Sequence, residues 1–209
     1  MSIEELHVKN VYNAIASEFD NTRYRPWTCV ESFLNSVPKG SIIGDIGCGN
    51  GKNMLYRKDC TNLGCDFSTG LVTICQKKNL NVVCGDILNI PFQDETFDFT
   101  ICIAVIHHLS TEEKRKKAIQ ELERVTKKNG KVLLLVWALE QDKDSRRKFI
   151  TQDNFVDWKD SKKNLLGKRY YYVFKEHELE SLVDENKGNL EVVNKFYEKG
   201  NWGIILKKR

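Results

Sequence analysis

The chain has 209 residues, of which 41% are hydrophobic and 30% are charged, and its formal net charge at pH 7 is +4. These values are ordinary for a soluble globular protein, and the length predicts one domain over residues 1–209. No apolar stretch is long enough for a membrane span, and residues 1–10 carry no signal-peptide pattern. We therefore expect no membrane association and a location in the cytoplasm, with the nucleus as a second compartment.

Two helices are predicted before the first strand. Residues 2–19 have an amphipathic pattern in which Ser2 and Glu5 are placed to form a capping box. Pro26 is well placed to begin a second helix, which should end near residue 36. Residues 1–37 thus form an N-terminal helical flank, which fits a lid over a cofactor site.

Apolar runs and helical patterns alternate along the rest of the chain. This alternation predicts an α/β, Rossmann-like fold with a mainly parallel seven-stranded sheet and helices on both faces. A helix should begin near Lys52, and the longest helix should start at Ser110 with Glu113. The expected strands are 42–46, 62–67, 81–86, 97–105, 131–139, 169–174 and a hairpin-like pair in 190–208. The expected helices are 69–78, 111–128 and 175–186. Residues 141–168 are expected to be a polar loop on the substrate side.

Cysteine spacing and charge distribution bear on possible ligands. The seven cysteines form no CxxC pair, so we expect reduced thiols in an intracellular protein and no metal site. Basic residues exceed acidic ones by 12 to 7 over residues 111–148 and by 5 to 1 over residues 159–169. Such a basic surface suits an anionic polymer such as RNA, but a solvated helix face with a lysine-rich loop explains the charges equally well.

The first predicted strand ends in a loop with glycine at positions 47, 49 and 51. The spacing matches neither a phosphate-binding P-loop nor a dinucleotide fingerprint, because Lys52 stands where the latter needs its third glycine. Asp45 followed by Gly-x-Gly-x-Gly resembles the first motif of the Rossmann-like S-adenosylmethionine (SAM) methyltransferases. A packing turn that binds no ligand is the alternative.

Further acidic residues follow the next two predicted strands. Asp66 is placed to accept hydrogen bonds from both ribose hydroxyls, although it could also cap the helix near Ser68. Asp86 with Ile87 stands where this superfamily binds adenine, and a loop Asx-turn is the alternative for Asp86. The residues expected around SAM are Asp45, Gly47, Cys48, Gly49, Gly51, Asp66, Phe67, Asp86, Ile87 and Ala104.

Motifs outside the SAM set resemble one narrower family over essentially the whole chain. They are Val11–Ala16, Thr22–Trp27, Asp45–Lys52, Ile103–His108, Trp137–Gln141 with Ser145–Arg147, Arg169–Tyr172 and Asn201–Trp202. Together they look like the eukaryotic tRNA methyltransferases that esterify 5-carboxymethyluridine at the wobble position of the anticodon. The resemblance implies SAM as cofactor, the tRNA anticodon stem-loop as substrate and a small zinc-binding activator subunit as partner. The expected edge strand at 81–86 could pair with such a subunit.

A carboxylate with a pKa of about 4 is already ionised at neutral pH, so this reaction needs positioning groups rather than a strong base. We expect Arg23 or Arg25 to hold the carboxylate or an anticodon phosphate and His108 to orient the base. Trp137 or residues 170–172 could stack on an extruded base, and Arg146 completes the set. His107 is expected to be structural, while Arg146, Arg147, Trp137 and Trp202 could be ordinary surface or core residues.

Three other functions are compatible with the cofactor motifs. A methyltransferase acting on a small molecule would share them but would leave Thr22–Trp27, Ser145–Arg147 and the basic surplus unexplained. Methylation of ribosomal RNA by a relative with the same activator is a second alternative. A non-catalytic RNA-binding scaffold is the third, and the intact acidic residues and loop glycines argue against it.

Overall fold

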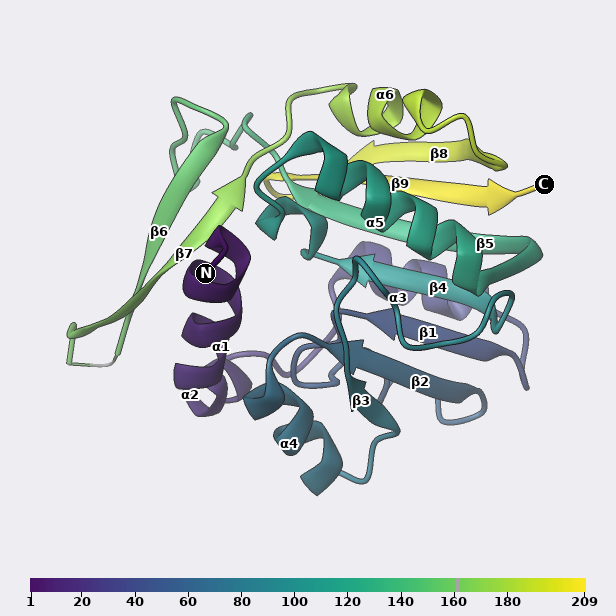
Figure 1. Cartoon of the computed structure of the whole chain (residues 1–209), viewed down its shortest axis with the longest axis horizontal. Helices are drawn as coiled ribbons and strands as arrows, with labels where there is room; N and C mark the ends of the chain where they lie inside the picture. The colour runs from purple at the N-terminus through teal and green to yellow at the C-terminus, as the bar shows by residue number, and fades with distance from the viewer. Residues whose placement is uncertain (161) are drawn as a thin grey trace.

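The computed structural model describes residues 1–160 and 162–209. Seven strands form one sheet in the order β3-β2-β1-β4-β5-β9-β8 (Figure 1). The first five pair in parallel, and β9 runs antiparallel between β5 and β8. The predicted mainly parallel, Rossmann-like sheet is therefore confirmed. Its strands are β1 (Ile42–Ile46), β2 (Thr61–Asp66), β3 (Val82–Cys84), β4 (Phe97–Ile103), β5 (Thr126–Trp137), β8 (Leu190–Tyr197) and β9 (Asn201–Lys208).

Helices cover both faces of this sheet because its central strands are apolar on both sides. In β5, Leu133 and Leu135 pack with helix α3 (Thr28–Asn35). Val132, Leu134 and Val136 face the other way, toward α5 (Glu112–Val125) and α6 (Glu178–Glu185). Helix α4 (Thr69–Lys77) packs beside β3, and Ser68 caps it by accepting a hydrogen bond from the backbone of Leu71. None of the helices in the described part of the chain is long and apolar enough to cross a membrane.

The N-terminal flank is helical but not continuous. A π-helical turn (Glu5–Lys9) leads into α1 (Asn10–Ala14) and α2 (Ala16–Asp20). The expected capping box is present, because Ser2 N donates to the Glu5 carboxylate at 2.8 Å and Glu5 N donates to the Ser2 hydroxyl at 3.1 Å. Asn13 Oδ1 accepts hydrogen bonds from Ser68 Oγ and Gly70 N, which ties the flank to the start of α4.

A two-stranded antiparallel sheet, β6 (Asp153–Lys159) and β7 (Leu165–Tyr172), stands beside the N-terminal helices (Figure 1). The expectation of a loop over 141–168 and a strand over 169–174 was therefore wrong for much of this segment. Half-buried and exposed residues alternate along β6. Val156 and Trp158, which we call the anchors of β6, thus lie on one face of the strand, and the polar residues around them conceal its period of two.

Two helix starts also differ from expectation. No helix begins near Lys52, because residues 52–56 form turns that bury Asn53 and Met54. Helix α5 starts after Thr111, whose hydroxyl accepts from Lys114 N. Ser110 cannot take the capping role because its hydroxyl and its backbone N–H both donate to Glu4. Strand β5 starts five residues earlier than expected, so the helix before it is shorter.

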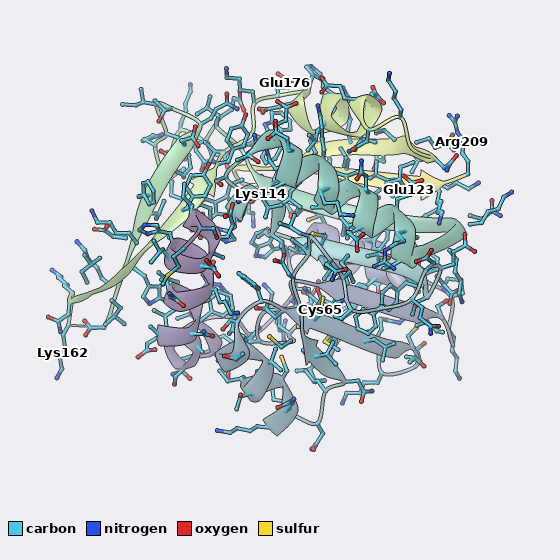
Figure 2. All side chains as sticks on the ribbon, viewed as in Figure 1. Cys65, Lys114, Glu123, Lys162, Glu176 and Arg209 are labelled. Carbon is cyan, nitrogen blue, oxygen red and sulfur yellow. The ribbon has the colours of Figure 1, made fainter. Side chains whose placement is uncertain are left out.

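Glu4 fastens the N-terminal flank to α5, on whose first turn Lys114 lies (Figure 2). Lys114 Nζ donates to Glu4 Oε2 at 2.7 Å, and Ser110 donates twice to Oε1. Burial alone would raise the pKa of Glu4, but the Lys114 and Ser110 bonds lower it to about 2. Because this pKa lies below the unfolded value, the bonds stabilise the fold above pH ~4.5 and the stabilisation disappears as the pH falls toward 2.

We predict that Glu4→Gln lowers the free energy of unfolding at pH 7 by about 1–3 kcal/mol, because it removes the charge that Lys114 and Ser110 bind. Urea denaturation of both proteins should give curves whose separation shrinks between pH ~4.5 and the acid limit of folding. Glu18→Gln, a change at an exposed position, is the control and should have little effect. Equal stability of the Glu4→Gln variant and the native protein at pH 7 would contradict the fastening role.

Candidate active site

A cavity opens at the carboxyl ends of β1, β2 and β4, against the N-terminal helices and the β6–β7 hairpin. It contains about 1250 Å³ of empty space, including its open mouth. Within the described residues, no group of three or more His, Cys, Asp or Glu side chains is placed to hold a metal ion.

The glycine loop forms one wall of the cavity. Gly47 has a φ of +75° and lies so close to Val105 that a Cβ atom would come within 2.3 Å of that side chain. Gly49 also has a positive φ, and its backbone N–H donates to Asp66 Oδ2 at 2.8 Å. Gly51 does not line the cavity; its missing side chain leaves room for Leu80. The sequence therefore identified the loop, but Gly51 serves packing rather than ligand approach.

The three acidic residues occupy different environments. Asp45 is 1% exposed, does not line the cavity, and binds only the Asn53 amide at 3.4 Å, so burial raises its pKa to about 7. Asp66 lines the cavity and accepts from Gly49 N and Ser68 N. Burial nevertheless raises the pKa of Asp66 against the effect of those bonds. Asp86 lines the cavity too, and its Oδ1 accepts from Leu88 N, so the Asx-turn is present while adenine binding stays a prediction.

The end of β4 contributes backbone and two histidines. Ala104 has a φ of +61°, an uncommon conformation for a residue with a side chain, and such strain concentrates at functional sites. His108 is fully bonded, since Nδ1 donates to Tyr170 O at 2.6 Å and Tyr12 OH donates to Nε2 at 3.1 Å. Burial lowers the pKa of His108 to about 3, so its ring is neutral and has no free nitrogen for a substrate.

His107 differs from its neighbour in having a free nitrogen. Trp137 N donates to His107 Nδ1 at 3.0 Å, which places the ring proton on Nε2. Nε2 is buried without a hydrogen-bond partner, and the residue lines the cavity. Burial and nearby positive groups, including Arg169, hold the pKa of His107 well below its usual value. His107 is therefore a neutral N–H donor whose Nε2 makes no hydrogen bond within the described residues.

Three arginines line the cavity, namely Arg23, Arg147 and Arg169. Among the described residues, none of the three forms an ion pair with a carboxylate. Burial and the charge of Arg169 lower the pKa values of Arg23 and Arg147. Arg25 and Arg146, which the sequence analysis had placed here, are exposed and outside the lining.

Aromatic rings hold these guanidinium groups in place. Arg147 lies 3.8 Å above the Trp137 ring, and Tyr171 stacks on Trp137 at 3.9 Å with an interplanar angle of 3°. Both groups sit over the ring centre, so they must occupy opposite faces. No face of Trp137 is therefore open for an extruded base, contrary to the expectation from sequence. Arg169 likewise lies 4.6 Å from Trp158, whose indole N–H is buried without a partner.

The remaining expected residues also have clear places. Cys48, Phe67 and Ile87 line the cavity together with Gly47, Gly49, Asp66, Asp86 and Ala104. The N-terminal flank contributes Glu4, Val8, Tyr12 and Phe19, so it covers the site as a lid would. Sequence reasoning passed over Arg169 and His107 as functional residues, although both lie in motifs it had singled out. The roles of His107 and His108 can be distinguished only from their hydrogen bonds in the folded chain.

Residues 44–134 match the model of the family described as "Methyltransferase domain". A Schizosaccharomyces pombe tRNA (carboxymethyluridine(34)-5-O)-methyltransferase is 40% identical over 98% of this chain and 97% of its own length. A Xenopus tropicalis protein of the same name, with the suffix alkbh8, is 35% identical over 99% of this chain but only 41% of its own length. The Arabidopsis thaliana enzyme is 50% identical over 68% of this chain and 35% of its own length. This chain therefore spans less than half of two of these three relatives.

Solved structures show the same fold at low sequence identity. The PH0226 protein of Pyrococcus horikoshii has a TM-score of 0.70 at 18% identity and covers 97% of each chain. A chain from the complex between the Haloferax volcanii Trm112 methyltransferase activator and a candidate methyltransferase has a TM-score of 0.70 at 14% identity, covering 96% of this chain and 97% of that one.

The lining residues fit SAM as the cofactor. Gly49 lines the ligand space, where a Cβ atom would lie 3.3 Å from the Phe19 ring, and Asp66 retains acceptor capacity for ribose hydroxyls. Asp86 and Ile87 offer a carboxylate and an apolar surface for an adenine ring. With this cradle and a full-length relative at 40% identity, the chain belongs to the family of tRNA (carboxymethyluridine(34)-5-O)-methyltransferases.

Proposed function

We propose that the chain transfers the methyl group of SAM to the carboxylate of 5-carboxymethyluridine at position 34 of tRNA, forming the methyl ester. The observation that carries this proposal is the set of cavity-lining arginines that lack carboxylate partners among the described residues. They share the cavity with the glycine loop and Asp66, so an anionic acceptor and the cofactor would meet there. The names of the relatives at 35–50% identity support the same substrate.

Transfer to a carboxylate suits a site without a free base. SAM, when bound, supplies the methyl group: its sulfonium S–CH3 bond breaks as the carboxylate O–CH3 bond forms, no proton moves, and S-adenosylhomocysteine leaves. The acceptor carboxyl is ionised at pH 7, so His108 need not remove a proton, and its two bonded nitrogens could not. The chain's contribution is then to position the acceptor oxygen and exclude water.

The roles divide between the two sides of the cavity. Asp66 and the Gly49 backbone hold the cofactor ribose, and Asp86 with Ile87 holds adenine. On the other side, Arg147 and Arg169 hold the acceptor carboxylate. The second oxygen of that carboxylate accepts a hydrogen bond from His107 Nε2, which otherwise has no partner. Arg23, beside Trp158, is placed to neutralise a phosphate of the same nucleotide.

A small zinc-binding activator is the proposed partner. Strand β3 is an edge of the sheet, and Val83 on it is 44% exposed. Such an edge can accept a strand from a second chain, and covering it would protect an apolar segment from aggregation. A cytoplasmic location, with the nucleus as a second compartment, follows as part of the same proposal.

The direct test is methyl transfer from labelled SAM to bulk tRNA of cells that lack the endogenous wobble methyltransferase, with and without a co-expressed activator. Nucleoside mass spectrometry should find the methyl ester of 5-carboxymethyluridine, with more product when the activator is present. Label in ribosomal RNA or in a small molecule would replace this substrate with one of the alternatives. Absence of SAM binding would instead favour a non-catalytic scaffold.

We predict that Arg147→Ala lowers kcat/KM for tRNA about 10- to 150-fold, the range expected for loss of a charge-assisted hydrogen bond of ~1.5–3 kcal/mol. The dissociation constant of SAM should change less than about twofold. Arg146→Ala is the matched control, because this neighbouring arginine is exposed and outside the cavity. An equal decrease of kcat/KM in both variants would show that Arg147 does not bind the carboxylate.

The two histidines should respond differently to asparagine. In His107→Asn, the amide oxygen can still accept from Trp137 N, but the donor no longer reaches the position of Nε2. We therefore predict up to about tenfold lower kcat/KM with an unchanged urea midpoint. His108→Asn should instead lower the free energy of unfolding by about 1 kcal/mol, because the Tyr12 bond is lost. The reverse pattern would show that His108 contacts the substrate.

A further inference from the structure

The β6–β7 hairpin has one side that belongs to the cavity. Arg169 on β7 lines the cavity, and Trp158 on β6 lies within 6.2 Å of the Phe19 ring and 5.7 Å of the Arg23 guanidinium. Midway along β7 the hairpin is tied to the N-terminal flank, where His7 Nδ1 bonds Lys168 O at 3.1 Å. The position of the hairpin relative to the proposed methyl-transfer site is thus fixed.

The outer end of the same hairpin is basic. Residues 159–168 contain four lysines and one acidic residue. Asp160 lowers this surplus to three charges, but within the described residues it forms no ion pair with a lysine, and its carboxylate accepts from Asn164 N at 2.8 Å and Asn164 Nδ2 at 2.9 Å. Lys159 approaches Asp157 only at 3.7 Å. Over the described residues, Lys162, Lys163 and Lys168 take part in no ion pair, and all three are exposed.

The hairpin carries these charges away from the body of the molecule. Figure 2 shows Lys162 at the far end of the hairpin, pointing into solvent. Leu165, the first residue of β7, is four positions from Arg169, or about 13 Å along the strand at ~3.3 Å per residue, and Lys162 lies beyond it in the turn. A small molecule held in the cavity could not reach that far. A polymer with one nucleotide in the cavity could contact both ends of the hairpin.

We propose that the β6–β7 hairpin is an RNA-binding arm whose terminal lysines bind phosphates of the anticodon stem while Arg169 and Trp158 face the nucleotide in the cavity. This inference rests on the proposed function, since the RNA is placed by its modified uridine. Lysine suits the contact because it binds phosphate as a flexible point charge and needs no fixed geometry. Such contacts carry no sequence information, so the arm would add affinity and register but not base specificity.

The test compares Lys162→Gln/Lys163→Gln with Lys39→Gln/Lys128→Gln in the complex with the activator. Lys39 and Lys128 are exposed too, but they lie before β1 and at the start of β5, at the opposite edge of the sheet from the cavity. Steady-state kinetics should be measured on tRNA at several salt concentrations and on the free 5-carboxymethyluridine nucleoside at high concentration.

Loss of two phosphate contacts should raise KM for tRNA about tenfold and reduce the slope of log KM against log salt concentration by about 1.5, with kcat unchanged. The Lys39→Gln/Lys128→Gln protein should match the native one. An unchanged KM and salt slope for tRNA would contradict the RNA-binding role of the arm. An equal rise in KM for the free nucleoside would contradict it too, because the nucleoside has no stem to bind. If the native complex methylates neither tRNA nor the nucleoside, the proposed function itself is wrong. That outcome is distinct from failure of the arm, because it is seen in the native protein and not only in the lysine variants.

Discussion

Uncompensated positive charge in a partly buried cavity is the constraint on which the site depends. Burial and the charge of Arg169 lower the pKa values of Arg23 and Arg147, and among the described residues none of the three arginines has a carboxylate partner. Arg169 is buried, Arg23 half-buried and Arg147 exposed, so the cost of an isolated charge falls mainly on Arg169, and the fold must hold these groups by means other than ion pairs. It does so with rings: Trp137 beneath Arg147, and Trp158 beneath Arg169. Cation–π contact offsets part of the cost while leaving the N–H donors free for an anion.

The opposite side of the cavity has the opposite electrostatic character. Asp66 and Asp86 follow β2 and β3, whereas Trp137 ends β5, and β3 and β5 are four strand spacings apart in the sheet, or about 19 Å. A cationic cofactor is therefore favoured on one side and an anionic acceptor on the other. Because β4 lies between them, its end, with the strained Ala104 and the donor His107, is where the two ligands would meet.

The sequence predicted the cofactor side better than the substrate side, for a physical reason. Glycine spacing and acidic strand ends depend on local backbone and sheet order, both of which periodicity reveals. Arg147 comes from a loop and Arg169 from a strand of a separate hairpin, and only tertiary packing brings them to one cavity. Polar residues between the anchors of β6 hid its strand pattern. Neighbouring arginines at 146 and 147 could not be told apart without knowing which one reaches Trp137.

The histidine pair shows how hydrogen bonds assign roles that residue type cannot. Both rings are buried, neutral and side by side, 4.6 Å apart between centroids. The Tyr170 carbonyl and the Tyr12 hydroxyl consume both nitrogens of His108, and Tyr12 belongs to the N-terminal flank. His108 therefore connects the flank to β7, and through β7 to Arg169. His107, in contrast, keeps an N–H without a partner in the cavity that Arg147 and Arg169 line.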